Sequence, residues 1–327
     1  MKISVIVPIY GVEKYLEKCL RSLFTQTKTD GVEFILVNDC TKDNSMLVAD
    51  KVISEFPSLN IKIINHEKNS GLAVARNTGV QASIGEYIQH IDSDDWVEPT
   101  MLEDLYKEAK ETDADIICCD YYIDDILGRQ YMKMPAPADS IDCLKKVLST
   151  ELTQSLCFKL VRRSLYKDDV DFYLAGVDTW EDLLASVKLF YFANRVAYLP
   201  KAYYHYVQLD TNSISRSGFS QKRLDNIIAV VNNIDSFFKR KEIYNSIEEY
   251  INYRKVYAKY SLIRGAGKLQ KKYSKTFPEI NKYIFYQKGM PFHNRLALFL
   301  ASHKCIIGFN FIIFCVKIMK TKIRKLK

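Results

Sequence analysis

Residues 87–95 read YIQHIDSDD, a short apolar run followed by three aspartates within four positions. The run 87–91 has the length and character of a buried strand. Carboxylates crowded this closely repel one another unless a cation or hydrogen-bond donors offset them, and an oxygen-rich cluster suits Mg²⁺ or Mn²⁺. A hard cation held by one or two carboxylates completes its shell with water and substrate phosphates. This stretch therefore predicts a strand end that binds a metal ion and a diphosphate.

A second acidic group follows another strand-like run upstream. Asn38 and Asp39 come directly after the apolar run 34–37. One carboxylate at a strand end is ordinarily a helix cap or a turn residue. Because both acidic groups follow strands of one expected sheet, we expect them to emerge at the same edge.

The first 120 residues alternate apolar runs with amphipathic stretches, as in βαβ units. The expected strands are residues 3–7, 34–37, 61–64, 87–91 and 116–119. The expected helices are residues 14–26, 45–56, 72–82 and 101–112. The pattern predicts an α/β fold with a mostly parallel sheet flanked by helices, in which ligands bind at the carboxyl ends of the strands.

The pattern changes after residue 122. Residues 123–150 are irregular until a helix near 143–148, and their role stays open. Residues 182–192 have helical spacing and 195–199 resemble a strand. From about Gln221 onward the pattern is helical, with no further strand signals.

Two other classes of nucleotide enzyme predict a glycine-rich loop after the first strand. A dehydrogenase carries Gly-x-Gly-x-x-Gly there, and a sugar nucleotidyltransferase carries its own glycine-rich loop. Pro8-Ile9-Tyr10-Gly11 stands at that place instead. Neither loop is present.

Four motifs share one order and spacing along the first 120 residues. They are VIVPIY (residues 5–10), LVNDCTKDNS (36–45), GLAVARNTG (71–79) and DSDD (92–95). Together they resemble the family 2 glycosyltransferases, and the likeness extends more weakly to about residue 216. The resemblance implies the nucleotide-diphospho-sugar transferase fold called GT-A, and it implies single-displacement, inverting chemistry.

The resemblance also implies a nucleotide-sugar site and a metal ion, Mn²⁺ or Mg²⁺. The implied nucleotide-sugar contacts are Pro8, Tyr10, Asp39, Arg76, Asn77, Asp92 and Ser93. Asp94 matches the metal ligand of the Asp-x-Asp pair, and His205 is a further candidate ligand or phosphate contact. Taken singly, Tyr10 is equally an ordinary turn residue, Arg76 a helix-surface arginine and His205 a packing residue.

A third acidic group contains the catalytic residues that the resemblance implies. Glu181 and Asp182 resemble the family's Glu-Asp pair, in which the aspartate is the general base that takes the acceptor hydroxyl's proton. A capping carboxylate is the alternative interpretation of Asp182. Trp180 is a candidate for stacking on an acceptor sugar, although a partly buried tryptophan needs no such role. Ser213 and Ser215 are candidate phosphate donors or turn residues.

Charge is concentrated at the end of the chain. Residues 280–327 contain ten Lys or Arg and no Asp or Glu; removing these ten charges from the net +8 leaves −2 on residues 1–279. A nucleic-acid-binding catalytic face would need its own basic stripe, so nucleic acid is excluded as a partner. The N-terminus shows no signal peptide, and we expect a cytoplasmic protein.

The basic region follows an apolar run. Residues 305–316 are 12 residues long, whereas crossing a bilayer takes about 20 apolar residues. The run and the basic residues after it favour an interfacial helix that binds anionic lipid on the inner face of the plasma membrane. A buried C-terminal helix with a charged end is the alternative.

The sequence thus predicts a GT-A catalytic domain over residues 1–216, with a nucleotide-binding half (about 1–120) and an acceptor half (about 121–216). A helical region, 217–327, follows. The predicted reaction moves a hexose or N-acetylhexosamine from a UDP-sugar to an acceptor during synthesis of capsule, O-antigen or teichoic acid. The acceptor is a saccharide, either free or linked to a lipid. The alternatives are an inactive homologue that scaffolds polysaccharide assembly and a sugar nucleotidyltransferase.

Overall fold

The computed structural model describes residues 1–208, 220–287 and 289–325. They form two compact units. The first comprises residues 1–144 and the described part of 153–217. The second comprises residues 145–152 and the described part of 218–327.

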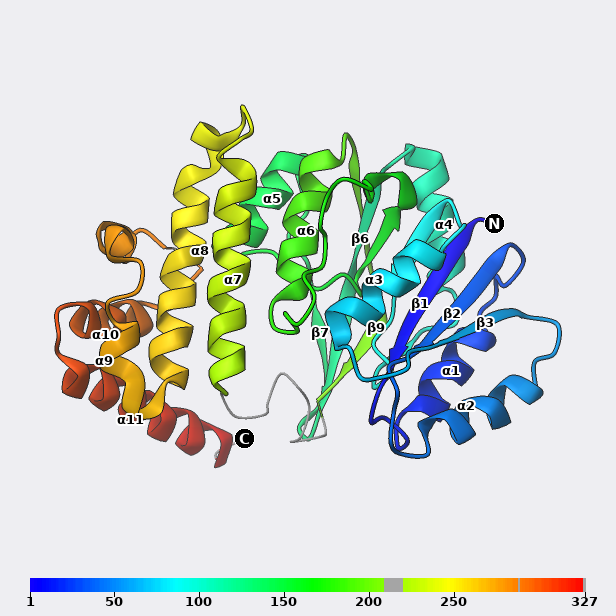
Figure 1. Ribbon diagram of the computed structural model, residues 1–327, viewed down its shortest axis with the longest axis horizontal. Helices are drawn as coiled ribbons and strands as arrows, with labels where there is room; N and C mark the ends of the chain where they lie inside the picture. The colour runs from blue at the N-terminus through cyan, green and yellow to red at the C-terminus, as the bar shows by residue number, and fades with distance from the viewer. Residues whose placement is uncertain (209–219, 288, 326–327) are drawn as a thin grey trace. The chain divides into compact units, whose positions relative to one another are not determined.

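The first unit is built on one mixed sheet, in which nine strands are described (Figure 1). The strand order is β3-β2-β1-β4-β8-β6-β9-β5, and β7 pairs with β6. The strands are β1 (Ile3–Ile9), β2 (Val32–Asn38), β3 (Asn60–Asn65), β4 (Tyr87–His90), β5 (Trp96–Val97), β6 (Ile116–Asp125), β7 (Gly128–Met132), β8 (Lys159–Arg162) and β9 (Val196–Val207). All seven residues of β1 are buried, as the apolar run at the start of the sequence predicts.

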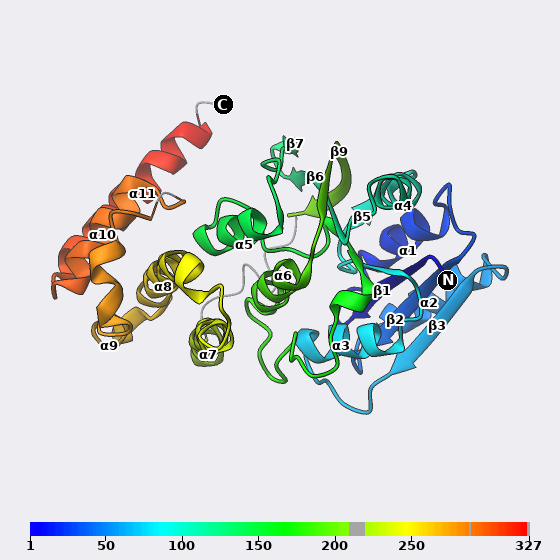
Figure 2. The ribbon, with the colours of Figure 1, turned by 90° about the horizontal axis from the view of Figure 1, so that it is seen from above.

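The strands β1 to β4 are mutually parallel, which confirms the predicted βαβ rhythm. Because right-handed crossovers run outward through β2 and β3 and then return to β4, they place α1 (Leu16–Phe24) and α2 (Ser45–Ser54) on one face. They place α3 (Leu72–Ala82) on the other, as Figure 2 shows. Gly79 lets α3 approach the sheet closely, since a Cβ at this position would collide with Ile6.

The other half of the sheet combines parallel and antiparallel pairs. β8 runs antiparallel to both β4 and β6, β6 pairs in parallel with β9, and β5 pairs antiparallel with β9. The helices α4 (Met101–Thr112) and α6 (Glu181–Phe192) belong to this half, with a 3₁₀ turn at Arg163–Leu165. The helix expected near residues 143–148 is α5 (Ser140–Ser149).

The last strand is longer than the sequence pattern predicts. The pattern predicts a strand over residues 195–199, but β9 extends to Val207 and includes Tyr203, Tyr204 and Tyr206. β9 is longer because it has a pairing partner on each side. Residues 202–207 pair with β6 beyond a register shift near Asp120, and Tyr204 and His205 pair with the two-residue strand β5.

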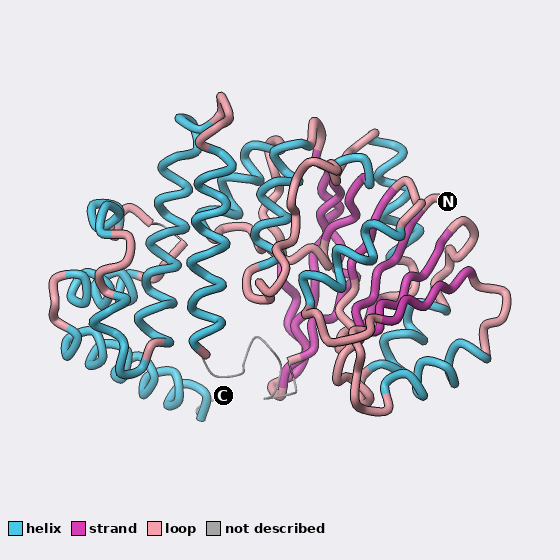
Figure 3. Tube along the Cα trace, viewed as in Figure 1, coloured by secondary structure: helices cyan, strands magenta, loops and turns pink. Residues whose placement is uncertain are grey.

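The described residues of the second unit contain helices and loops (Figure 3), in agreement with the helical pattern after Gln221. The α-helices are α7 (Gln221–Phe238), α8 (Tyr244–Gly265), α9 (Gln270–Tyr273), α10 (Phe292–Ser302) and α11 (Ile306–Lys325), with 3₁₀ turns at Gly267–Leu269 and Pro278–Tyr283. Buried Arg254 donates to the carbonyl oxygens of Val147 and Leu148, so the last turn of α5 is bound to this unit. In the described ranges, every helix is too short or too polar to span a bilayer.

Candidate active site

The carboxyl ends of β1, β2 and β4 lie at one edge of the sheet, because the three strands are parallel. Pro8 is buried in β1 opposite Val37, and Tyr10, just beyond that strand, is 47% exposed. Asp39 follows β2 and Asp92 follows β4. The two acidic groups therefore emerge on the same edge, as the sequence predicts.

Asp39 anchors the turn that precedes α3. Its buried carboxylate accepts hydrogen bonds from the backbone N–H groups of Ser70 and Gly71, both at 2.8 Å, and its Oδ1 lies 2.7 Å from His66 Nδ1. Gly71 has φ +93°, and a side chain there would collide with Asp178. A carboxylate has about four lone-pair sites, so these three bonds leave one site for the nucleotide-sugar contact that the family resemblance implies.

Arg76 binds three carboxylates from two distant segments of the chain. Its guanidinium is 1% exposed; Nη2 donates to Asp92 Oδ1 at 2.7 Å, and Nη1 donates to Glu181 Oε1 at 2.7 Å and to Asp182 Oδ1. Helix α3 thereby joins the end of β4 to the first turn of α6. The family resemblance implies that Arg76 contacts the nucleotide or diphosphate. In this structure its two terminal nitrogens donate to protein carboxylates instead.

Burial controls the ionisation of this cluster. Burial raises the pKa of Glu181 to about 8, and the neighbouring Asp182 charge adds to the rise while Arg76 opposes it. Burial also raises the pKa of Asp182, against the opposing effect of Arg76. For Arg76, burial disfavours the charge, but Asp182, Asp92 and Glu181 outweigh it and raise its pKa. A carboxylate with a raised pKa is a stronger base, which suits Asp182 to proton abstraction.

Glu181→Gln is expected to flatten the pH dependence of stability. A carboxyl whose pKa rises from 4.5 unfolded to about 8 folded stabilises the protein fully below pH 4.5 and loses that contribution as pH rises toward 8. The glutamine amide cannot ionise, so the fall in melting temperature between pH 5 and 8.5 should shrink by about 2 °C or more. Thermal denaturation across this range measures it. Exposed Glu67→Gln is the matched control, and equal slopes in both variants would contradict the assignment.

The loop after β4 is fixed by β9. Buried Asp95 accepts hydrogen bonds from the Tyr204 hydroxyl and the Val207 backbone N–H, both at 2.7 Å, and the Tyr204 oxygen accepts from the Asp92 backbone N–H at 3.1 Å. Burial raises the pKa of Asp95, and the charges of Asp94 and Asp92 raise it further. Ser93 is buried in the same loop.

The donor set of this loop fits a hard divalent cation. Asp92 and Asp94 offer partly exposed carboxylates, and their charges crowd Asp95 as the sequence predicts. Within the described residues no three His, Cys, Asp or Glu side chains converge into a complete metal site. A cation here would need oxygens from substrate to complete its shell, as Mg²⁺ does on phosphates.

His205 does not fit the metal role that the resemblance suggests. Its Nε2 lies 2.9 Å from Glu98 Oε1 and its Nδ1 lies 3.1 Å from Asp124 Oδ2, while its fully buried ring stacks on Trp96 with 3.5 Å between the ring centroids. Carboxylates therefore occupy both ring nitrogens of His205, and neither nitrogen is available to bind a metal ion. Ser213 and Ser215 lie outside the described residues.

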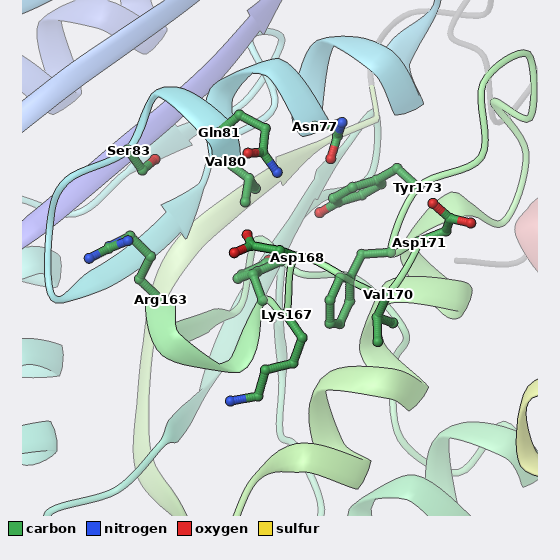
Figure 4. Close-up of a pocket in the computed structure, with 12 residues that line it drawn as sticks. Asn77, Val80, Gln81, Ser83, Arg163, Lys167, Asp168, Val170, Asp171 and Tyr173 are labelled. Carbon is green, nitrogen blue, oxygen red and sulfur yellow. The ribbon is translucent and has the colours of Figure 1, made fainter.

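Two predicted residues lie beside the arginine cluster rather than in it. Trp180 is the N-cap residue of α6, with φ +64°, directly before Glu181. Asn77 is exposed and lines a separate polar cavity of about 210 Å³ between α3 and residues 163–173, drawn in Figure 4. Two cavity tyrosines, Tyr166 and Tyr173, have hydroxyls 3.0 and 3.3 Å from Nε2 of buried His90, just upstream of the aspartates.

The sheet, with Asp39 and the Asp92–Asp95 loop at one edge of its parallel strands, has the α/β architecture of the GT-A fold. The chain belongs to glycosyl transferase family 2, whose family model matches residues 4–169. The glycosyltransferase GlyA of Streptococcus pneumoniae serotype 4 is 34% identical over 229 residues, which cover 66% of this chain and 32% of the relative. The chain thus spans only part of that relative's length.

Solved structures agree with the fold. Staphylococcus aureus TarS 1–349 in complex with UDP-GlcNAc has a TM-score of 0.73 at 22% identity, over 95% of this chain and 90% of that one. The mannosyltransferase PcManGT from Pyrobaculum calidifontis, in complex with GDP-Man and Mn²⁺, has a TM-score of 0.54 at 16% identity, over 95% and 85% of the two chains. At these identities the likeness establishes the fold.

Proposed function

We propose that this chain is an inverting, metal-dependent glycosyltransferase that moves a hexose or N-acetylhexosamine from a UDP-sugar to an acceptor hydroxyl in surface-polysaccharide synthesis. The observation that carries the proposal is the Arg76 cluster. It joins Asp92, at the strand edge where a nucleotide diphosphate would bind, to Asp182, a buried carboxylate suited to act as base. The structure of TarS with UDP-GlcNAc supports a UDP-sugar as donor.

The proposed chemistry needs one proton transfer in the protein. Asp182 takes the proton of the acceptor hydroxyl while that oxygen attacks the anomeric carbon, and the bond to the diphosphate breaks on the opposite side of the sugar. Glu181 and Arg76 position Asp182. Asp94 would hold the metal, which when bound neutralises charge on the leaving diphosphate. Tyr10, Asp39 and Ser93 would contact the nucleotide, and Trp180 the acceptor.

The first experiment is thermal stabilisation by nucleoside diphosphates, each with and without Mn²⁺. A ligand present at 100 times its Kd stabilises the folded protein by about 2.7 kcal/mol, so binding gives a clear shift in melting temperature. A Mn²⁺-dependent shift with UDP alone supports the donor class. The absence of any shift would contradict the proposal and favour a scaffold that does not bind nucleotide.

Asp94→Ala is expected to abolish the Mn²⁺-dependent part of UDP binding, because it removes the proposed protein ligand of the metal. Isothermal titration with UDP and Mn²⁺ should show affinity reduced to the metal-free level, about tenfold or more weaker. Exposed Asp50→Ala on α2 is the matched control and should bind as the wild type does. Unchanged affinity in Asp94→Ala would remove the metal role of this residue.

Products distinguish the proposed transferase from the alternatives. A glycosyltransferase releases UDP in proportion to the amount of acceptor supplied, whether that acceptor is a free or a lipid-linked saccharide. A nucleotidyltransferase releases pyrophosphate instead. A hydrolase or scaffold shows no acceptor dependence. The protein is incubated with a panel of UDP-sugars and oligosaccharide acceptors and, in a separate reaction, with UTP and sugar 1-phosphates. Measuring UDP, free sugar and pyrophosphate in each reaction separates these outcomes.

A further inference from the structure

Among the described residues, helix α11 packs one of its faces against α8 and α10. Phe309 is 1% exposed, and its ring centroid lies 6.1 Å from that of Tyr260 on α8. A side chain at Gly308 would press on Leu300 of α10. One face of this helix therefore contributes to the core of the second unit.

The opposite face of α11 exposes a row of large apolar side chains, which we call the α11 stripe. Its members are Ile307 (86% exposed), Phe311 (67%), Phe314 (61%) and Ile318 (41%). Their spacing of four, three and four residues places them on one side of an α-helix, about 100° per residue around the axis. Met319, 55% exposed, adjoins the stripe. Scattered exposed apolar residues are normal on protein surfaces, whereas a continuous row of this kind marks an interaction site.

Charge indicates what the α11 stripe binds. The last 48 residues carry ten Lys or Arg and no Asp or Glu, and Lys317 is an exposed member of α11 itself. Five of the ten lie in the helix, at positions 317, 320, 322, 324 and 325. If a second copy paired through the same stripe, it would bring two such basic helices together without acidic partners. An anionic lipid surface offers both apolar depth and negative charge.

We propose that α11 lies in the interface of an anionic membrane, with the α11 stripe inserted among the lipid chains and Lys317 at the headgroups. The helix has 20 residues, but its charges keep it parallel to the surface rather than across the bilayer. The sequence pattern suggested a membrane-binding tail; the structure assigns the docking face to four named side chains. This inference does not depend on the proposed transferase reaction.

The test is co-sedimentation of the full chain with phosphatidylcholine vesicles that contain about a quarter phosphatidylglycerol, compared with pure phosphatidylcholine vesicles. The wild type should bind the anionic vesicles, and about 0.5 M NaCl should weaken that binding. Phe311→Ser/Phe314→Ser should bind at least about tenfold more weakly, because the inserted area is lost. Leu47→Ser/Ile84→Ser, 68% and 64% exposed in the first unit, is the matched control and should bind normally.

Circular dichroism and melting temperature show whether each variant is folded; the replaced phenylalanines are exposed, so little change is expected. Three outcomes would overturn the proposal: no binding by the wild type, equal binding to neutral vesicles, or full binding by the double variant. A wild type that is dimeric by light scattering, with a monomeric double variant and no vesicle binding, would assign the α11 stripe to a second copy. UDP binding is measured in a separate experiment. If the protein does not bind UDP, the vesicle-binding result still tests the membrane proposal.

Discussion

Asp182→Asn is expected to lower kcat about 10³-fold, because the asparagine amide cannot take the acceptor's proton. Asparagine has the shape of aspartate, and its carbonyl oxygen still accepts the hydrogen bond from Arg76. We therefore expect unchanged donor affinity and a folded protein. The measurement is UDP release at saturating donor and acceptor, together with calorimetric UDP binding.

The pH profile separates a base from a structural role. Burial raises the pKa of Asp182, so wild-type kcat should fall as pH decreases through that raised value, when the carboxyl becomes protonated. Asp182→Asn should lack this dependence. Exposed Asp171→Asn is the matched control with wild-type kcat. Retention of a tenth or more of the activity by Asp182→Asn would exclude it as the base.

The sheet edge could be predicted from local pattern alone. Short apolar runs identified β1 to β4, and parallel strands place their ends together, so Asp39 and Asp92 were expected to be neighbours. The same rule would have found His66, which follows β3 and contacts Asp39. It was missed because a lone histidine after a strand carries no signal until the sheet order is known.

Contacts between distant segments were harder to predict. Arg76 meets Glu181 across 105 positions, and a single sequence holds no information about which carboxylates surround a buried guanidinium. Tyr204 likewise binds Asp95 because β9 continues past its predicted end. The role of Asp182 came from resemblance to the family and not from periodicity. The structure adds that one guanidinium group, that of Arg76, forms ion pairs with three carboxylates of the candidate site.

Arg76→Met is expected to lower the free energy of unfolding by about 3–5 kcal/mol, because removal of one partner leaves buried charges uncompensated. Its guanidinium is 1% exposed and binds Asp92, Glu181 and Asp182. Chemical denaturation at pH 7.5 measures the loss. Arg21→Ala is the matched control, since Arg21 also pairs with two carboxylates but is 37% exposed, and exposed pairs contribute about 0–1 kcal/mol.

The sign of the pH effect distinguishes lost charge compensation from lost packing. Without Arg76 the pKa values of Glu181 and Asp182 in the folded protein rise further above their unfolded values, so the contribution of these two carboxyls to stability is lost as pH increases above about 4.5. The gap between wild type and Arg76→Met should therefore widen from pH 5 to pH 8.5. Adding Glu181→Gln should narrow that gap at high pH, since one ionisable group is removed. A pH-independent loss, or one no larger than that of Arg21→Ala, would mean that Arg76 acts by filling space and that the carboxylates find their compensation elsewhere.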